Sequence, residues 1–149
     1  MPTFDQARDE ILGRFKAQWD ADTPAVNGGA VPKVFWEGVG EVLDKPHDAA
    51  YAAPVIRHGP SEQASLAGDG ALRRFEKRGI IIVSIFSPLS GGKGLVLSEA
   101  LAKVAKRAFE GKETPSHVWF RNATINEVGV SGPWYQMNVI AEFVYDELA

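Results

Sequence analysis

Residues 118–145, VWFRNATINEVGVSGPWYQMNVIAEFVY, decide the fold of this chain. In the second half of this stretch every second residue is large or apolar, the periodicity of a half-buried strand: Tyr135, Met137, Val139, Ala141, Phe143 and Tyr145. Upstream, residues 118–128 are rich in β-branched and aromatic side chains, and residues 129–133 supply the glycines and proline of a turn. We therefore expect two long antiparallel strands joined as a hairpin.

A second run, residues 80–86 (IIIVSIF), is apolar on both of its faces. A strand of this kind lies inside its sheet and is covered on each side, because both rows of side chains need burial. The run follows a charged stretch that carries Arg73, Arg74 and Arg78. Shorter strands are indicated at residues 34–36 and 53–57, so the sequence predicts four or five strands in all.

Two helices are predicted to accompany the sheet. Thr3 and Gln6 have the spacing of a capping box, and the apolar side chains that follow recur on one helical stripe: Phe4, Ala7, Ile11, Phe15 and Trp19. This helix should end before Pro24, and a second amphipathic helix is expected over residues 95–109. The predicted fold class is α+β, a single two-layer domain with a mixed, mostly antiparallel sheet and the two helices packed on one face.

The composition is that of an ordinary globular chain: 149 residues, 45% apolar, 23% charged, with a net charge of −3. We expect one domain over residues 1–149, with a long polar loop at residues 58–71. The longest apolar run is too short to span a membrane, and no secretory signal is recognisable. Cysteine is absent, which excludes disulfides and thiol catalysis. Folding in the cytoplasm is expected.

No catalytic constellation is recognisable in the sequence. Residues 90–94 (SGGKG) follow a strand and precede a helix, but they lack the spacing of a phosphate-binding loop. His47, His58 and His117 fall in expected loops or at element ends without metal-ligand spacing, so we interpret them as surface imidazoles. The sequence predicts no enzyme, no cofactor and no metal site.

The second face of the strand at residues 80–86 has no obvious cover within the chain, because two helices suffice for one face of the sheet. Identical subunits would supply that cover, which predicts an oligomer in which the polar loop orders on assembly. The basic stretch around Arg73, Arg74 and Arg78 is a candidate interface. Nucleic-acid binding is the competing interpretation, but the overall charge is acidic and no nucleic-acid motif is present.

Several stretches together resemble a known family: the amphipathic N-terminal helix, residues 32–37 (PKVFWE), residues 73–79 (RRFEKRG) after a glycine-rich loop, and the hairpin with residues 118–122 (VWFRN) and 132–139 (GPWYQMNV). They are similar to the tail terminator proteins of tailed phages and prophages, of the minor tail protein U type. The resemblance implies a subunit, monomeric or weakly associating in solution, that forms a hexameric ring on the tail tube, stops tube polymerisation and provides the head-joining surface. The implied partners are further copies, the major tail protein and head-tail joining proteins, with no membrane and no specific nucleic acid. The implied location is the virion tail, after assembly in the host cytoplasm.

The resemblance places the subunit or tail-tube interface on the polar loop, on the basic stretch and on an exposed tryptophan. These residues are Ser61, Glu62, Gln63, Leu66, Arg73, Arg74, Arg78 and Trp36. Trp119, Trp134 and Tyr135 are either interface anchors or members of the sheet's own core. Two alternatives remain open: a head-tail connector or neck protein, and a small-ligand-binding or enzymatic α+β domain with its cleft between the helices and residues 91–94.

Overall fold

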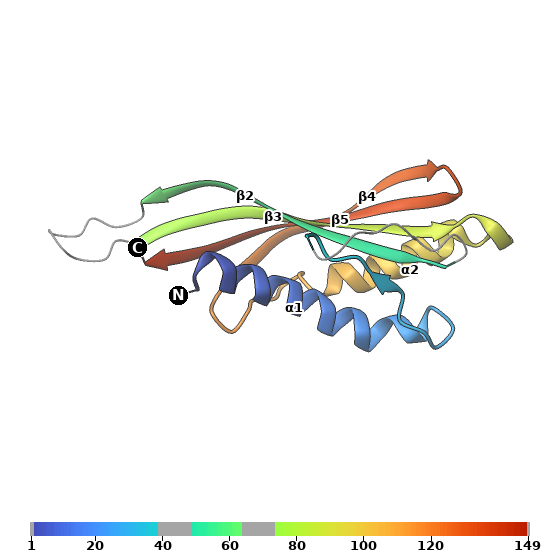
Figure 1. Cartoon of the computed structure of the whole chain (residues 1–149), viewed down its shortest axis with the longest axis horizontal. Helices are drawn as coiled ribbons and strands as arrows, with labels where there is room; N and C mark the ends of the chain where they lie inside the picture. Colours follow the sequence, from blue (N-terminus) through green and yellow to red (C-terminus); the bar gives the residue numbers. More distant parts are fainter. Residues whose placement is uncertain (1, 39–48, 64–73, 149) are drawn as a thin grey trace, which may run out of the picture.

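The computed structural model describes residues 2–38, 49–63 and 74–148. Two helices and five strands make up this part of the chain (Figure 1). The helices are α1 (Phe4–Asp22) and α2 (Gly94–Arg107), and the strands are β1 (Lys33–Val34), β2 (Tyr51–Gln63), β3 (Arg74–Pro88), β4 (Trp119–Ser131) and β5 (Trp134–Leu148). Short 3-10 turns follow α1 at Thr23–Ala25 and precede α2 at Ser90–Gly92. The predicted α+β class is confirmed. Neither helix is long and apolar enough to cross a membrane, as far as the described residues go.

The strands form one sheet in the order β1-β2-β3-β5-β4. β1 pairs with β2 in parallel, and the three remaining pairs are antiparallel. The run at residues 80–86 lies in β3, the middle strand, as its two apolar faces predict. Its neighbours are β2 and the second strand of the predicted hairpin, β5.

Both helices lie on the same side of the sheet (Figure 1). The core forms between them and the inward-facing row of each long strand, and its fully buried members include Ile11, Phe15, Trp19, Leu101, Val104, Ile81, Val83, Ile85, Val139 and Ala141. The period-2 pattern of β5 therefore predicted its buried row correctly, apart from Tyr135, which packs against the core but is only partly buried. Arg14 ties the two helices together, since its Nε donates to the carbonyl oxygen of Ala108 at 3.0 Å.

The start of α1 follows the sequence prediction. The backbone amide of Thr3 donates to the Gln6 side chain at 3.0 Å, and the Gln6 amide donates to the Thr3 hydroxyl at 3.4 Å, which is the reciprocal capping box. The helix ends at Asp22, one residue before the Thr23–Ala25 turn that contains Pro24. The capping box therefore gives a hydrogen-bond partner to two backbone amides at the start of α1, those of Thr3 and Gln6.

Two predictions about strand length were wrong. β2 runs from Tyr51 to Gln63, so residues 58–63, which composition places in a loop, are strand; residues 64–71 of that expected loop lie outside the described residues. The cause is tertiary, because β3 pairs with this polar segment beyond a bulge between His58 and Ser61. β1 is shorter than expected and ends at Val34, although the Phe35 amide still donates to the carbonyl oxygen of Ala52 at 2.9 Å.

Candidate assembly interface

The side of the sheet away from the helices is only partly covered, and we call it the open face. From Ile80 to Pro88 the side chains of β3 alternate between fully buried on the helix side and half-buried on the open face. Residues paired across neighbouring strands point to the same face of the sheet, so Ile82 lies on the open face between Val55 of β2 and Ile140 of β5. The open face includes Tyr51, Ala53, Val55, Arg57, Ile80, Ile82, Ser84, Phe86, Trp134, Gln136, Asn138, Ile140, Glu142, Arg121, Thr124 and Asn126.

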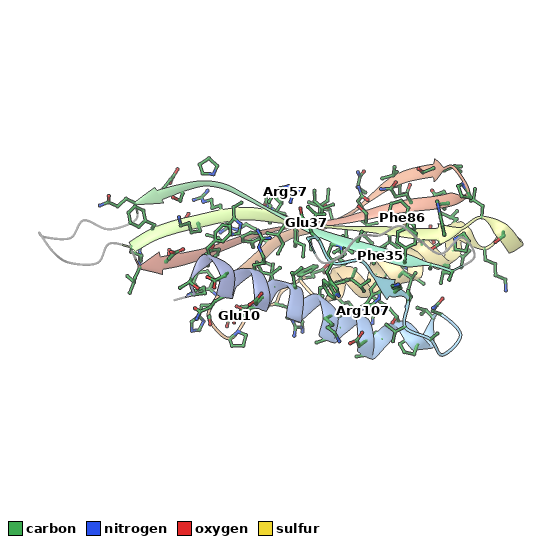
Figure 2. All side chains as sticks on the ribbon, in the orientation of Figure 1. Glu10, Phe35, Glu37, Arg57, Phe86 and Arg107 are labelled. Carbon is green, nitrogen blue, oxygen red and sulfur yellow. The ribbon has the colours of Figure 1, made fainter. Side chains whose placement is uncertain are left out.

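One end of the open face is closed by the chain's own aromatic rings. Tyr51 stacks on Phe86 with ring centroids 4.7 Å apart, and it meets Trp134 and Phe35 edge-on at 5.2 Å each. Figure 2 shows Phe35 and Phe86 on neighbouring parts of the structure. Tyr51 is buried by this cluster, and burial raises the pKa of its hydroxyl. Trp134 is therefore a core residue of the open face rather than a free anchor.

Among the described residues, the middle of the open face is a mixed strip without such a cover. Ile80, Ile82 and Ile140 are half-buried, and Ser84 and Asn138 face each other directly across β3 and β5. A strip of aliphatic side chains interrupted by hydroxyl and amide groups suits a protein interface, where an apolar centre is combined with hydrogen-bonding groups.

Charged side chains follow the strip toward the other end of the sheet. Arg57 pairs with Glu37 at 2.7 Å, and the two lie together in Figure 2. Arg78 pairs with Glu76 on its own strand at 2.5 Å, and Glu76 raises the pKa of that guanidinium. All four side chains reach solvent, so these ion pairs contribute little to stability and can exchange partners on assembly.

The hairpin leaves a trough at this end of the sheet. β5 continues to Leu148, whereas β4 begins at Trp119 opposite Val144, so β5 extends beyond its neighbour. Two adjoining hollows of about 370 and 340 Å³ occupy the step, and both are lined by Arg121 and Val144. Trp119 borders the first hollow with 52% of its surface exposed, and its indole N–H donates to Glu113. Sequence patterns alone left the role of Trp119 open, and its alternation with buried Phe120 is the signal that points it outward.

Most of the predicted site residues lie at this same end. Ser61, Glu62 and Gln63 are exposed and pair with β3 opposite Lys77, Glu76 and Phe75, respectively. Arg74 and Arg78 are exposed on the adjoining part of β3, and Arg74 lies 3.8 Å from Asp146 of β5. Leu66 and Arg73 lie outside the described residues.

Trp36 is not the freely exposed tryptophan that the sequence suggested. Its indole is half-buried and packs on the helix side, edge-on to Phe15 with ring centroids 6.1 Å apart. The physical reason is that consecutive side chains of a strand-like segment point to opposite sides. Phe35 thus joins Tyr51 on the open face, while Trp36 joins the core.

The sequence prediction for His58 was also wrong. It belongs to β2 rather than to a loop, and its half-buried ring lies against Phe4, Phe143 and Tyr145. Burial lowers the pKa of this imidazole, with smaller contributions from the positive charges of Arg8 and Lys77. His117 is exposed, as expected, and lies 3.6 Å from Glu113; His47 is outside the described residues.

The turn at residues 91–94, which a ligand-binding alternative would use, is closely packed at its end. A Cβ on Gly94 would lie 3.2 Å from the carbonyl oxygen of Pro88 and 3.3 Å from side-chain atoms of Leu89 and Tyr135. In the part of the chain that is described, no group of three histidine, aspartate or glutamate side chains is placed to hold a metal ion.

Comparison with known proteins identifies the fold. No family model matches the sequence, and no curated protein matches it. A solved structure that carries no descriptive name aligns with a TM-score of 0.66 at 15% identity, covering 100% of this chain and 97% of that one. A chain of the solved "Virion of native gene transfer agent (GTA) particle" aligns with a TM-score of 0.54 at 15% identity, covering 93% of each chain. At this identity the likeness shows a shared fold.

Proposed function

We propose that this protein is a structural subunit of a phage-like virion, and more specifically a tail terminator that closes the tail tube as a ring of identical subunits. In this role the ring ends tube growth and offers the surface that joins tail to head. The observation that carries the proposal is the likeness over 93% of both chains to a component of a gene transfer agent virion. A match over 93% of both chains concerns a unit of similar size and architecture rather than a shared motif.

The open face gives a physical reason for assembly. Ile80, Ile82 and Ile140 keep part of their apolar surface in contact with water in the single chain. Covering such surface stabilises an assembly by about 25 cal/mol per Å², and a stable interface buries roughly 800 Å² on each partner. A neighbouring subunit placed on this face would supply the cover that α1 and α2 give to the other face.

The charged end of the sheet supports a reversible contact. Its ion pairs, Arg57–Glu37 and Arg78–Glu76, are exposed and formed within one chain. Such pairs exchange at little cost, since solvent screens exposed charges and the pairs contribute little to stability. They suit a subunit that stays monomeric or weakly associated until a tube end gathers several copies.

The test is a charge placed in the middle of the open face. Ile82→Lys should leave the monomer folded, because the lysine stem can extend its ammonium group to water, but it should prevent ring formation and give overlong tails in particle-producing cells. Tail length and ring formation are measured by electron microscopy, and the folding of the monomer is measured by circular dichroism. Val130→Lys is the matched control: this side chain is 69% exposed at the hairpin tip, and its register partner Tyr135 packs on the helix side.

Rings and tails of normal length from the Ile82→Lys protein would refute the assignment of the open face. If that variant does not fold, Ser84→Lys repeats the experiment at a polar position of the same face. A head-tail connector or neck subunit is the second candidate, since a virion component of this fold fits either joint. Particles that lack the protein distinguish the two: overlong tubes indicate a terminator, whereas tails of normal length detached from heads indicate a connector.

A further inference from the structure

His58 joins the first turn of α1 to the end of the sheet. Its ring stacks on Phe4, the first residue of the helix, with centroids 4.0 Å apart and planes at 29°. On the other side it meets Phe143 and Tyr145 of β5 edge-on, at 5.2 and 5.9 Å. Both β5 rings are 2% exposed, so the imidazole lies between the first residue of α1 and two buried rings of the sheet.

Only one of the two ring nitrogens has a partner among the described residues. Nε2 lies 3.0 Å from the hydroxyl oxygen of Tyr145, whereas Nδ1 is buried without a hydrogen bond. A neutral ring meets this arrangement as the tautomer with its proton on Nε2, which donates to the Tyr145 hydroxyl oxygen and leaves Nδ1 without a proton. A protonated ring carries two N–H groups, and the one on Nδ1 would then be buried with no acceptor, which is a costly state.

The charges around the ring also oppose protonation. Arg8 of α1 and Lys77 of β3 both add positive potential at His58. The acidic group nearby is Glu147 of β5, which acts on Tyr145; burial, together with this carboxylate, raises the pKa of the Tyr145 hydroxyl to about 12. Tyr145 therefore keeps its proton, and among the described residues no carboxylate contributes to the lowered pKa of His58.

We propose that His58 is a proton-sensitive latch, which holds the first turn of α1 against β2 and β5 while the imidazole is neutral and releases it when the ring is protonated. Release lets the charged ring reach water, at the loss of the Phe4 stack. The exposed segment of Ser61, Glu62 and Gln63 follows on the same strand after a bulge. Mild acid would therefore loosen the end of the subunit that carries most of the predicted interface residues.

The direction of the effect follows from linkage. Burial holds the pKa of His58 below its ordinary value of 6.5 while the latch is closed, so protons bind more tightly to the released state. The latch is fully closed above about pH 6.5 and weakens as the pH falls from there toward the pKa of the closed form. The opening equilibrium shifts about tenfold for each unit that separates the two pKa values.

Nuclear magnetic resonance of the wild-type chain tests the proposal without any substitution. The His58 ring protons should titrate below pH 6.5, and the amides of the first turn of α1, including that of Ala7, should exchange faster with solvent at pH 5 than at pH 7 after correction for intrinsic rates. The Ala7 amide is a suitable reporter because it donates to the Thr3 carbonyl oxygen at 2.9 Å. A His58 that titrates at or above 6.5 would overturn the latch.

Two variants separate the latch from a general effect of acid. His58→Phe keeps a ring between Phe4 and Phe143 but cannot be protonated, so exchange in the first turn should become independent of pH between 5 and 7. His117→Phe changes an exposed histidine two residues before β4 and should leave the pH dependence as in the wild type. Persistence of the full pH dependence in the His58→Phe protein would show that another group is responsible.

Discussion

Replacement of Gly79 by alanine tests the register and packing of the central strand. Gly79 lies in β3 opposite His58 of β2 and Phe143 of β5. A Cβ atom at this position would lie 2.5 Å from the Arg57 carbonyl oxygen and 2.5 Å from the Phe143 ring. Distances this short require one neighbour to move, and the Phe143 ring is 2% exposed within the core.

The expected cost follows from these contacts. Overpacking of a well-packed core costs about 1–3 kcal/mol, whereas alanine gains roughly 0.5–1 kcal/mol over glycine through the unfolded state and backbone propensity. The steric term is the larger here, because one of the clashing atoms belongs to the backbone of β2 and cannot rotate away. We expect Gly79→Ala to lower the free energy of unfolding by about 1–2 kcal/mol, which corresponds to a fall of a few degrees in Tm.

Gly13→Ala is the matched control, because it makes the same chemical change in the interior of α1. A Cβ at Gly13 meets nothing within 4 Å, so this variant should be more stable than the wild type by about 0.5–1 kcal/mol. Urea unfolding followed by circular dichroism measures both variants, with comparison of the midpoints and slopes. A Gly79→Ala protein as stable as the wild type would refute the β2–β3–β5 packing described here.

Three further outcomes are expected. Thr3→Ala removes the hydroxyl that accepts from Gln6 and should cost about 1 kcal/mol of stability in urea unfolding, with Thr3→Ser retaining most of it. Trp19→Phe loses the indole N–H that donates to the Pro32 carbonyl oxygen at 3.0 Å in a fully buried site, and it should cost roughly 1–3 kcal/mol by the same assay; an unchanged midpoint would contradict that hydrogen bond. Because the pKa of His58 is lowered on folding, the unfolded chain binds the proton more tightly than the folded chain. The free energy of unfolding should therefore be highest above about pH 6.5 and should fall as the pH drops below that value. Urea unfolding midpoints at pH 7.5 and pH 5 measure this, and the His58→Phe protein should lose that part of the pH dependence.

Local pattern was enough to predict the elements with strong periodicity. The alternation in residues 135–145 gave the buried row of β5, and the two apolar faces of residues 80–86 gave the central position of β3. The capping box at Thr3 gave the first residue of α1. These features depend on side chains within a few positions of one another, where hydrogen-bonding geometry and the period of the backbone determine the outcome.

The sequence predicted only part of the candidate interface. The charge of Arg74 and Arg78 and the polarity of residues 61–63 drew attention to one end of the sheet, but composition placed the latter in a loop. Pairing with β3 makes them strand, since a ladder of backbone hydrogen bonds does not require apolar side chains. The trough beside Trp119 could not be predicted, because it arises from the different lengths of β4 and β5.

By itself, the sequence predicted the strongly periodic helices and strands, which rows of their side chains are apolar, and that one face of the sheet is less covered than the other. Only the tertiary structure decided which face that is, how far β2 extends, and that His58 and Tyr145, 87 positions apart, share a hydrogen bond. The physical reason is that periodicity constrains the backbone locally, whereas burial and the pKa of a side chain depend on neighbours that the fold brings from distant parts of the chain.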